Sequence, residues 1–250
     1  MFLSIKVNEI VHNPPFSELD IMEMAFYVKQ TVHRYLDLIN MGYLEMEHTF
    51  AQEENDTITI QFNQNNSEHV EYANTTLYRN LLKIYQFCFV EKDKAVFVSD
   101  KNNTDMFEGL TMGGMNDFLS ETLSPCLSYH SLSENGVMDD YYEGDKIHRL
   151  FIAFFAHLKL HFGSLSDSGS CPSFEMHHQN VYRLGVHEEH FSFRELTMLS
   201  GYQTERAVRN LASPSTPEHR RISVIKEGRL TYITFEEATR WLRANSRLEF

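Results

Sequence analysis

The chain has 250 residues, of which 42% are hydrophobic and 23% charged, so it is long enough to bury a core and is not expected to be disordered as a whole. The formal net charge is -13, yet from Val186 onward ten Lys and Arg stand against nine Asp and Glu, so the acidity lies in the part of the chain before Val186. This asymmetry predicts two parts with different partners, and the acidic part repels nucleic acid at long range.

The three cysteines, Cys88, Cys126 and Cys171, are far apart and form no CxxC pair. This spacing argues against a disulfide or zinc framework and favours a reducing compartment. The N-terminal stretch MFLSIKVNEI lacks a basic region followed by an apolar run, so no signal peptide is expected. The longest apolar run, Leu150–Phe162, is too short to span a bilayer. We therefore expect a cytoplasmic protein that does not enter a membrane.

Apolar residues recur at helical spacing in several segments of the chain before Gly163. The first expected helix begins after Ser17, a good N-cap residue, and ends near Gly42. The next begins at Thr75 or Thr76, and Pro125 is expected to stop a third. The expected helices cover residues 18–40, 76–89, 116–123 and 138–162, and short strands are expected at 2–7, 57–62 and 95–98.

A small, polar stretch with Gly and Pro, GSLSDSGSCP, follows the fourth helix and has the composition of a linker. It divides the chain into a mostly helical domain (1–163), a linker (164–185) and a C-terminal domain (186–250). The predicted fold class is mainly α with short β elements.

The C-terminal domain contains two short helices with strong start signals. Ser192 and Glu195 form the pattern of a capping box, Gly201 permits a sharp turn, and Thr204 can cap a second helix that runs to about Ala212. Helix, tight turn and helix make a helix-turn-helix unit, whose second helix enters the DNA major groove.

A hairpin and a third helix are predicted after this unit. Alternating apolar residues flank the turn Lys226-Glu227-Gly228-Arg229, which is typical of a β-hairpin. Thr234 and Glu237 form a second capping-box pattern, and Trp241 lies at core spacing in the helix that follows. This order of elements is that of a winged helix-turn-helix.

Three motifs carry a family resemblance: ELTMLSGYQTERAVRN, EGRLTYI and EEATRWL. On these motifs, the segment from about 190 to 243 resembles the excisionase/MerR-like winged helix-turn-helix domains. The resemblance implies binding to double-stranded DNA through the second helix and the wing. The chain before Val186 carries no such resemblance.

Side chains suited to a duplex cluster in this region. Arg pairs with guanine, Asn or Gln with adenine, and basic residues on the wing contact phosphates. The candidate DNA-binding residues are Gln203, Thr204, Arg206, Arg209, Asn210, Arg220, Arg221, Lys226 and Arg229. An alternative interpretation is a solvated helix surface, in which Arg209 pairs with Glu205 one turn back.

Other chemistry has weaker support in the sequence. His157 and His161 lie one helical turn apart, but the pair lacks the Glu of an HExxH motif, so packed or surface histidines are the default and no metal or other cofactor is predicted. The carboxylates that could supply acid/base or Mg²⁺ chemistry look more like a helix start: Asp139, Asp140, Glu143 and Asp145. No phosphate-binding loop or nucleophile motif is present, so an enzyme is not predicted.

The sequence therefore predicts a sequence-specific DNA-binding protein, a bacterial-type transcriptional regulator. Between Thr204 and Arg229 six basic residues stand against three acidic ones, a modest excess that favours a homodimer to strengthen binding. The N-terminal domain is expected to dimerise, sense a small molecule or bind a partner protein. The alternatives are a protein-docking module on the same fold and an enzyme housed in residues 1–162.

Overall fold

The computed structural model describes residues 15–42, 75–90, 112–134, 144–165, 178–228 and 230–245, and these are mainly helical with a two-stranded sheet. In chain order the elements are α1 (Glu18–Gly42), α3 (Thr76–Tyr85), the π-helical turn η1 (Gln86–Val90), α5 (Met112–Glu134), α6 (Gly144–Phe162), α7 (His178–Arg183), α8 (Phe193–Ser200), α9 (Glu205–Asn210), the 3-10 turn η4 (Glu218–Arg220), β1 (Ile225–Glu227), β2 (Leu230–Tyr232) and α10 (Phe235–Ala244). The strands expected at 2–7, 57–62 and 95–98 lie outside the described residues.

Side-chain caps set the starts of α1 and α3 as the sequence predicts. At α1 the Ser17 hydroxyl accepts a hydrogen bond from the backbone N–H of Asp20 at 3.2 Å, and the Asp20 carboxylate accepts one from the Ser17 N–H at 2.7 Å. At α3 the Thr75 hydroxyl accepts one from the N–H of Tyr78 at 3.2 Å. Each cap satisfies donors that the first helical turn leaves free.

Helix α5 is longer than the sequence predicts. The expectation that Pro125 stops a helix over 116–123 is wrong, because α5 continues through the proline. Leu123, Cys126 and Tyr129 on either side of it are all buried in the hydrophobic core. Proline inside a helix costs roughly 3 kcal/mol, and burial of side chains on both sides offsets that cost.

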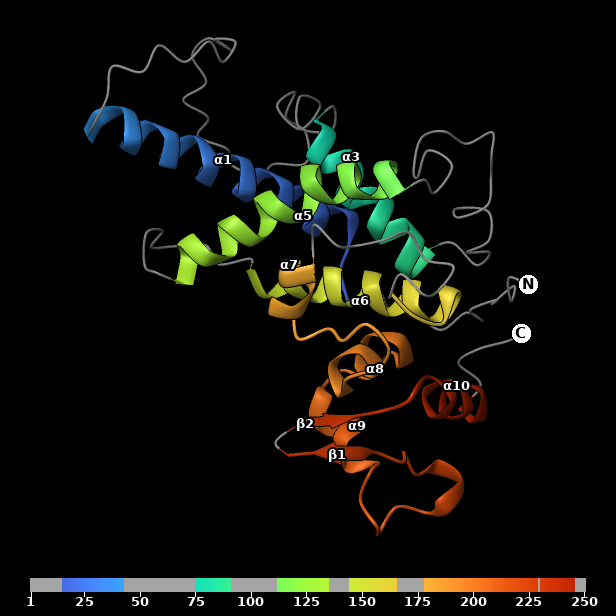
Figure 1. The fold of residues 1–250 in the computed structure, drawn as a ribbon. Helices are drawn as coiled ribbons and strands as arrows, with labels where there is room; N and C mark the ends of the chain where they lie inside the picture. Colours follow the sequence, from blue (N-terminus) through green and yellow to red (C-terminus); the bar gives the residue numbers. More distant parts are fainter. Residues whose placement is uncertain are drawn as a thin grey trace.

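Two hydrophobic clusters share helix α6. The first gathers buried residues of α1, α3, η1, α5, α6 and α7 with Met198 of α8. The second gathers those of α8, α9 and α10 with Ala156 and Leu160 of α6, Phe191 before α8, and Ile222 and Ile233 on either side of the hairpin. Figure 1 shows α6 lying between the upper layer of α1, α3 and α5 and the C-terminal elements below. The apolar run that marks this helix in the sequence is thus buried on two sides.

Part of the predicted linker is packed structure. Within 164–185, Leu165, Val181 and Leu184 are buried in the first cluster, and Val186 follows them there. These positions are therefore not a free tether, although the stretch has the composition of a linker. Their apolar side chains pack in the cluster formed by α1, α3, α5 and α6, here called the helical body.

Candidate nucleic-acid interface

The turn between α8 and α9 has the geometry that its residues predict. Ser192 and Glu195 make the complete capping box at the start of α8. Gly201 closes that helix in the left-handed conformation with φ 69°, which favours glycine. The Thr204 hydroxyl accepts a hydrogen bond from the Ala207 N–H at 3.3 Å and begins α9. These local bonds fix where α9 starts and which way it leaves the turn.

The inner side of α9 is held by the second hydrophobic cluster. Val208 is fully buried there with Leu196 of α8 and Trp241 of α10. The Trp241 indole also lies near the Tyr202 ring, and its Nε1–H donates to the backbone carbonyl of Arg220 at 3.0 Å. The packing role predicted for Trp241 is confirmed.

The outer side of α9 carries the candidate base-contacting residues. Arg206 makes no hydrogen bond or ion pair with another described residue, so its guanidinium stays available. Helix α9 ends at Asn210, somewhat before the predicted end at Ala212. The residues predicted to face the duplex from this helix and its cap are all exposed: Gln203, Thr204, Arg206, Arg209 and Asn210.

A carboxylate lies among these cations. Glu205 pairs with Arg209 one turn later and with Arg194 of α8, whose Nε lies 3.3 Å from Glu205 Oε2. The Arg209 guanidinium also lies 5.5 Å from the centroid of the Phe193 ring. The pairing that the sequence offers as an alternative role for Arg209 is present, although its side chain remains 64% exposed.

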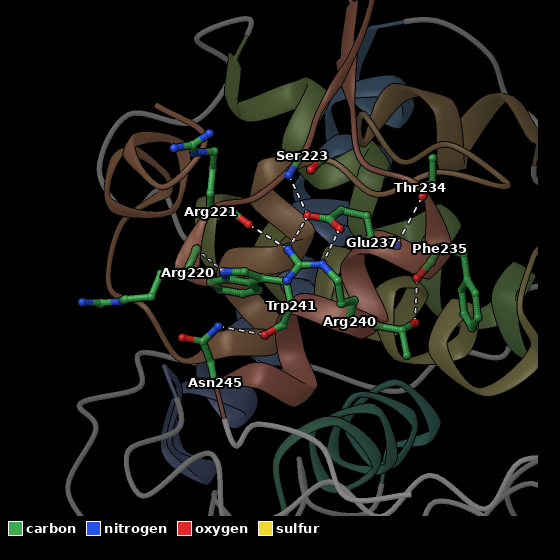
Figure 2. A network of polar contacts seen from close by, with 10 residues as sticks. Arg220, Arg221, Ser223, Thr234, Phe235, Glu237, Arg240, Trp241 and Asn245 are labelled. Atoms are coloured by element: carbon green, nitrogen blue, oxygen red, sulfur yellow. Dashed lines mark hydrogen bonds and ion pairs between the residues drawn. The ribbon is translucent and has the colours of Figure 1, made fainter. Parts of the chain in front are cut away.

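The two arginines before the hairpin have different surroundings. Arg221 is half-buried, and its guanidinium donates to the backbone carbonyls of Pro214 and Thr216 at 2.8 Å each, so it braces the loop. This bracing differs from the phosphate contact that the sequence predicts for Arg221. Arg220 is exposed, and in Figure 2 its side chain extends away from the network around Trp241.

Sequence reasoning missed a network between α10 and the chain that leads into the hairpin (Figure 2). The Thr234 hydroxyl caps α10 through the Glu237 N–H as predicted, but the Glu237 carboxylate does not complete the capping box. It accepts instead from the backbone N–H of Ser223 at 2.6 Å and from Arg240 at 2.6 and 2.7 Å. Arg240 also donates to the Arg221 carbonyl at 2.8 Å, so α10 holds the chain that enters the hairpin.

Glu237 and Arg240 shift each other's pKa values. Partial burial tends to raise the pKa of Glu237, but the hydrogen bonds from Arg240 and from the Ser223 N–H outweigh it and hold the pKa below its usual 4.5. The same carboxylate raises the pKa of Arg240. Both groups therefore stay charged across the neutral range.

Strands β1 and β2 form the predicted hairpin. They pair antiparallel, with Glu227 opposite Leu230, and Gly228 at the turn has φ 60°. Lys226 is exposed on β1, whereas Arg229 lies outside the described residues. The hairpin is tied to the start of α8 by two backbone hydrogen bonds between Phe191 and Ile233, at 2.8 and 2.9 Å.

A groove of about 660 Å³ separates α9 from the hairpin. Arg194, Arg209 and Lys226 line it, with Glu205 as the carboxylate among them. The apolar part of the lining comes from Leu184, Phe193, Val224 and Leu230. The groove thus gathers cations from α8, α9 and β1 on a partly apolar floor, an arrangement that suits an anionic partner.

The other candidate residues form no site in the described part of the chain. His157 lies against Phe87, with ring centroids 6.0 Å apart, and His161 against Phe162 at 4.8 Å. A search of the described residues finds no group of three or more side chains placed to bind a metal ion. Asp139, Asp140 and Glu143 lie outside the described residues, and Asp145 lies in the first turn of α6.

No family model, curated protein or solved structure matches this chain. In the part of the chain that the structure describes, every helix is too short or too polar to cross a bilayer.

Proposed function

We propose that the protein binds double-stranded DNA sequence-specifically through a winged helix-turn-helix formed by α8, α9, the hairpin and α10, and that it acts as a transcriptional regulator. Helix α9 would enter the major groove, with Arg206 and Asn210 facing the base edges. Lys226 and Arg220 would lie along the phosphates beside it. In this proposal the protein works in the cytoplasm and is not an enzyme.

The observation that carries the proposal is that α9 has one buried face and one exposed face. Its inner side is fixed by Val208 in the second cluster, whereas Arg206 and Asn210 stand exposed on a helix whose start is set by the Thr204 cap. A recognition helix needs this combination, because its reading side chains must be solvent-facing while its orientation is held by the core.

Charge limits the affinity of one copy. The excess of basic residues between Thr204 and Arg229 is small, and Glu205 offsets part of it next to Arg194 and Arg209. Few phosphate contacts give weak, salt-sensitive binding. We therefore propose a homodimer, in which two copies reading adjacent half-sites combine their affinities, and a helical body that dimerises or responds to an effector.

The test is selection of duplexes from a random library at low salt, followed by fluorescence anisotropy on the enriched sequence. Arg206→Glu should weaken binding to that sequence at least about fivefold, because a good base contact is worth about 1–3 kcal/mol. Lys226→Ala should weaken all duplexes similarly and reduce the salt slope by about one.

Arg79→Glu is the matched control for Arg206→Glu, since Arg79 is an exposed helical arginine of α3, on the opposite side of the molecule from α9 (Figure 1). Arg79→Glu makes the same change in net charge as Arg206→Glu, and its affinity for the duplex should stay within about twofold of the parent's affinity. If no duplex is enriched, or if both variants lose binding equally, sequence-specific recognition by α9 is excluded.

One observation favours docking of a protein segment as a second candidate. Leu230 is 52% exposed and Ile225 is 42% exposed, and Leu230 lines the groove with Phe193 and Val224. Exposed apolar residues beside cations suit an acidic, amphipathic peptide. Leu230→Asp discriminates the two functions: it should abolish docking of such a peptide but leave the effect of Arg206 on duplex binding intact.

A further inference from the structure

Lys159 of α6 is a charged side chain with no exposed surface. Its Nζ donates to the backbone carbonyls of His187 at 2.8 Å and His190 at 2.5 Å, and lies 2.5 Å from Oε1 of Glu195. Two of the three N–H donors of the ammonium group therefore go to backbone carbonyls, and the Glu195 carboxylate is its ion-pair partner.

The Glu195 side chain is equally buried, and its two carboxylate oxygens contact different partners. Its Oε1 meets Lys159, while its Oε2 accepts from the Ser192 N–H at 2.8 Å and from the Ser192 hydroxyl at 3.0 Å. The carboxylate that caps α8 is therefore also the partner of a cation on the helical body. One pair of side chains joins the start of the first helix of the proposed DNA-binding unit to α6.

The contacts of Lys159 reach the wing as well. Its Nζ lies 4.5 Å from the centroid of the Phe191 ring, and the backbone of Phe191 pairs with Ile233 at the end of the hairpin. The connection at 187–190, the start of α8 and the base of the hairpin thus converge on this cation. Moving Lys159 relative to these groups breaks several directional bonds at once.

A buried ion pair of this kind is a poor source of net stability. Desolvating two charges costs about as much as their attraction returns, and well-packed apolar replacements are often as stable or more so. Burial lowers the pKa of Lys159, and the carboxylate of Glu195 opposes that shift. What the pair adds over an apolar contact is direction, because hydrophobic surfaces tolerate sliding and hydrogen bonds do not.

We propose that Lys159 and Glu195 are positioning residues that fix the orientation of the C-terminal unit on α6. The consequence for DNA rests on the proposed function: in a dimer, a fixed orientation sets the distance between two α9 helices and so selects the spacing of half-sites. Changes in the helical body that shift α6 would then move the reading helix with it.

The orientation can be measured without DNA by a spin-label distance distribution. Labels are placed by Arg79→Cys on α3 and Glu236→Cys on α10, both exposed positions, with Cys171→Ser. Cys88 and Cys126 are buried. Diluted into unlabelled protein, so that distances within one copy are read, the parent should give one narrow distance. Lys159→Met with Glu195→Leu should broaden it clearly while the melting temperature stays within a few degrees. An unchanged, narrow distribution in this folded variant overturns the proposal.

Glu195→Gln is the second variant, for the case in which the double variant does not fold. The amide keeps a carbonyl for Ser192 or Lys159 but removes the charge, so partial broadening is expected and an unchanged width again contradicts the proposal. With selected duplexes, the double variant should still bind a single half-site but lose its preference for one spacing. Failure of the parent to bind any duplex counts against the proposed function alone, whereas the label distances test the positioning role by themselves.

Discussion

Replacing Trp241 by Phe tests whether α10 anchors the loop that leads to the hairpin. The indole is fully buried in the second cluster, and its Nε1–H donates to the backbone carbonyl of Arg220 at 3.0 Å. Phenylalanine keeps an aromatic ring in the same place but removes this donor and the second ring. The substitution therefore isolates the anchor from the general need for a large apolar side chain.

The expected loss has two parts. Removing the pyrrole part of the indole costs roughly 2 kcal/mol, at about 0.8 kcal/mol for each buried carbon-sized group. Leaving the Arg220 carbonyl without its donor costs about 1 kcal/mol, near the lower end for an unsatisfied group, because Arg220 itself is exposed and water can approach it. Together they predict a free energy of unfolding about 3 kcal/mol lower, a large fraction of the 5–15 kcal/mol typical of domains.

Guanidinium chloride unfolding followed by far-UV circular dichroism measures the change, since the variant has lost the only tryptophan and cannot be followed by its fluorescence. The midpoint should fall while the denaturant slope stays constant. Glu236→Ala, at an exposed position on the same helix, is the control and should change stability by no more than about 0.5 kcal/mol. A loss below about 1 kcal/mol for Trp241→Phe would refute the anchoring argument.

Two further predictions concern groups whose geometry is set locally. Because the folded-state pKa of Glu237 lies below its unfolded value, its bonds to Arg240 and Ser223 stabilise the protein fully above the unfolded pKa and lose that effect as pH falls through the folded one. Glu237→Gln should thus lower the free energy of unfolding at pH 7, by about 1–2 kcal/mol, and the gap from the parent should close in titrations below pH 4.5; a constant gap would contradict it. Gly201→Ala should lower the melting temperature through a cost of about 1 kcal/mol, because its φ of 69° disfavours a side chain; an unchanged melting temperature would show that the turn relaxes.

Helix starts are the part of the fold that the sequence predicts best. The caps at Ser17, Thr75, Ser192, Thr204 and Thr234 all form as their residue types suggest. Each of these bonds joins groups three positions apart in the chain, so the information needed to predict it is local. The hairpin turn at Gly228 belongs to the same class.

Long-range partners are the part that the sequence does not predict. The Lys159–Glu195 pair joins α6 to α8, and Glu237 leaves its own cap to bind Ser223. Nothing in the spacing of these residues distinguishes them from solvated charges, which are the usual state of Lys and Glu. The sequence offers one indication of a buried charge, a lysine within an apolar run. Lys159 stands between Leu158 and Leu160 in the apolar run Leu150–Phe162.

The shared position of α6 bears on how an acidic protein would bind DNA under the proposed function. The excess negative charge lies before Val186, and a freely tethered body would sample positions close to the duplex. The buried bonds of Lys159 and the packing of Val181 and Leu184 hold the body on one side of the C-terminal unit instead. Figure 1 shows α1, α3 and α5 across α6 from the hairpin, so the charges on these three helices act on a partner at the hairpin from a distance where salt screens them. Loosening this attachment should therefore weaken duplex binding most at low ionic strength, where the charges of the body are least screened.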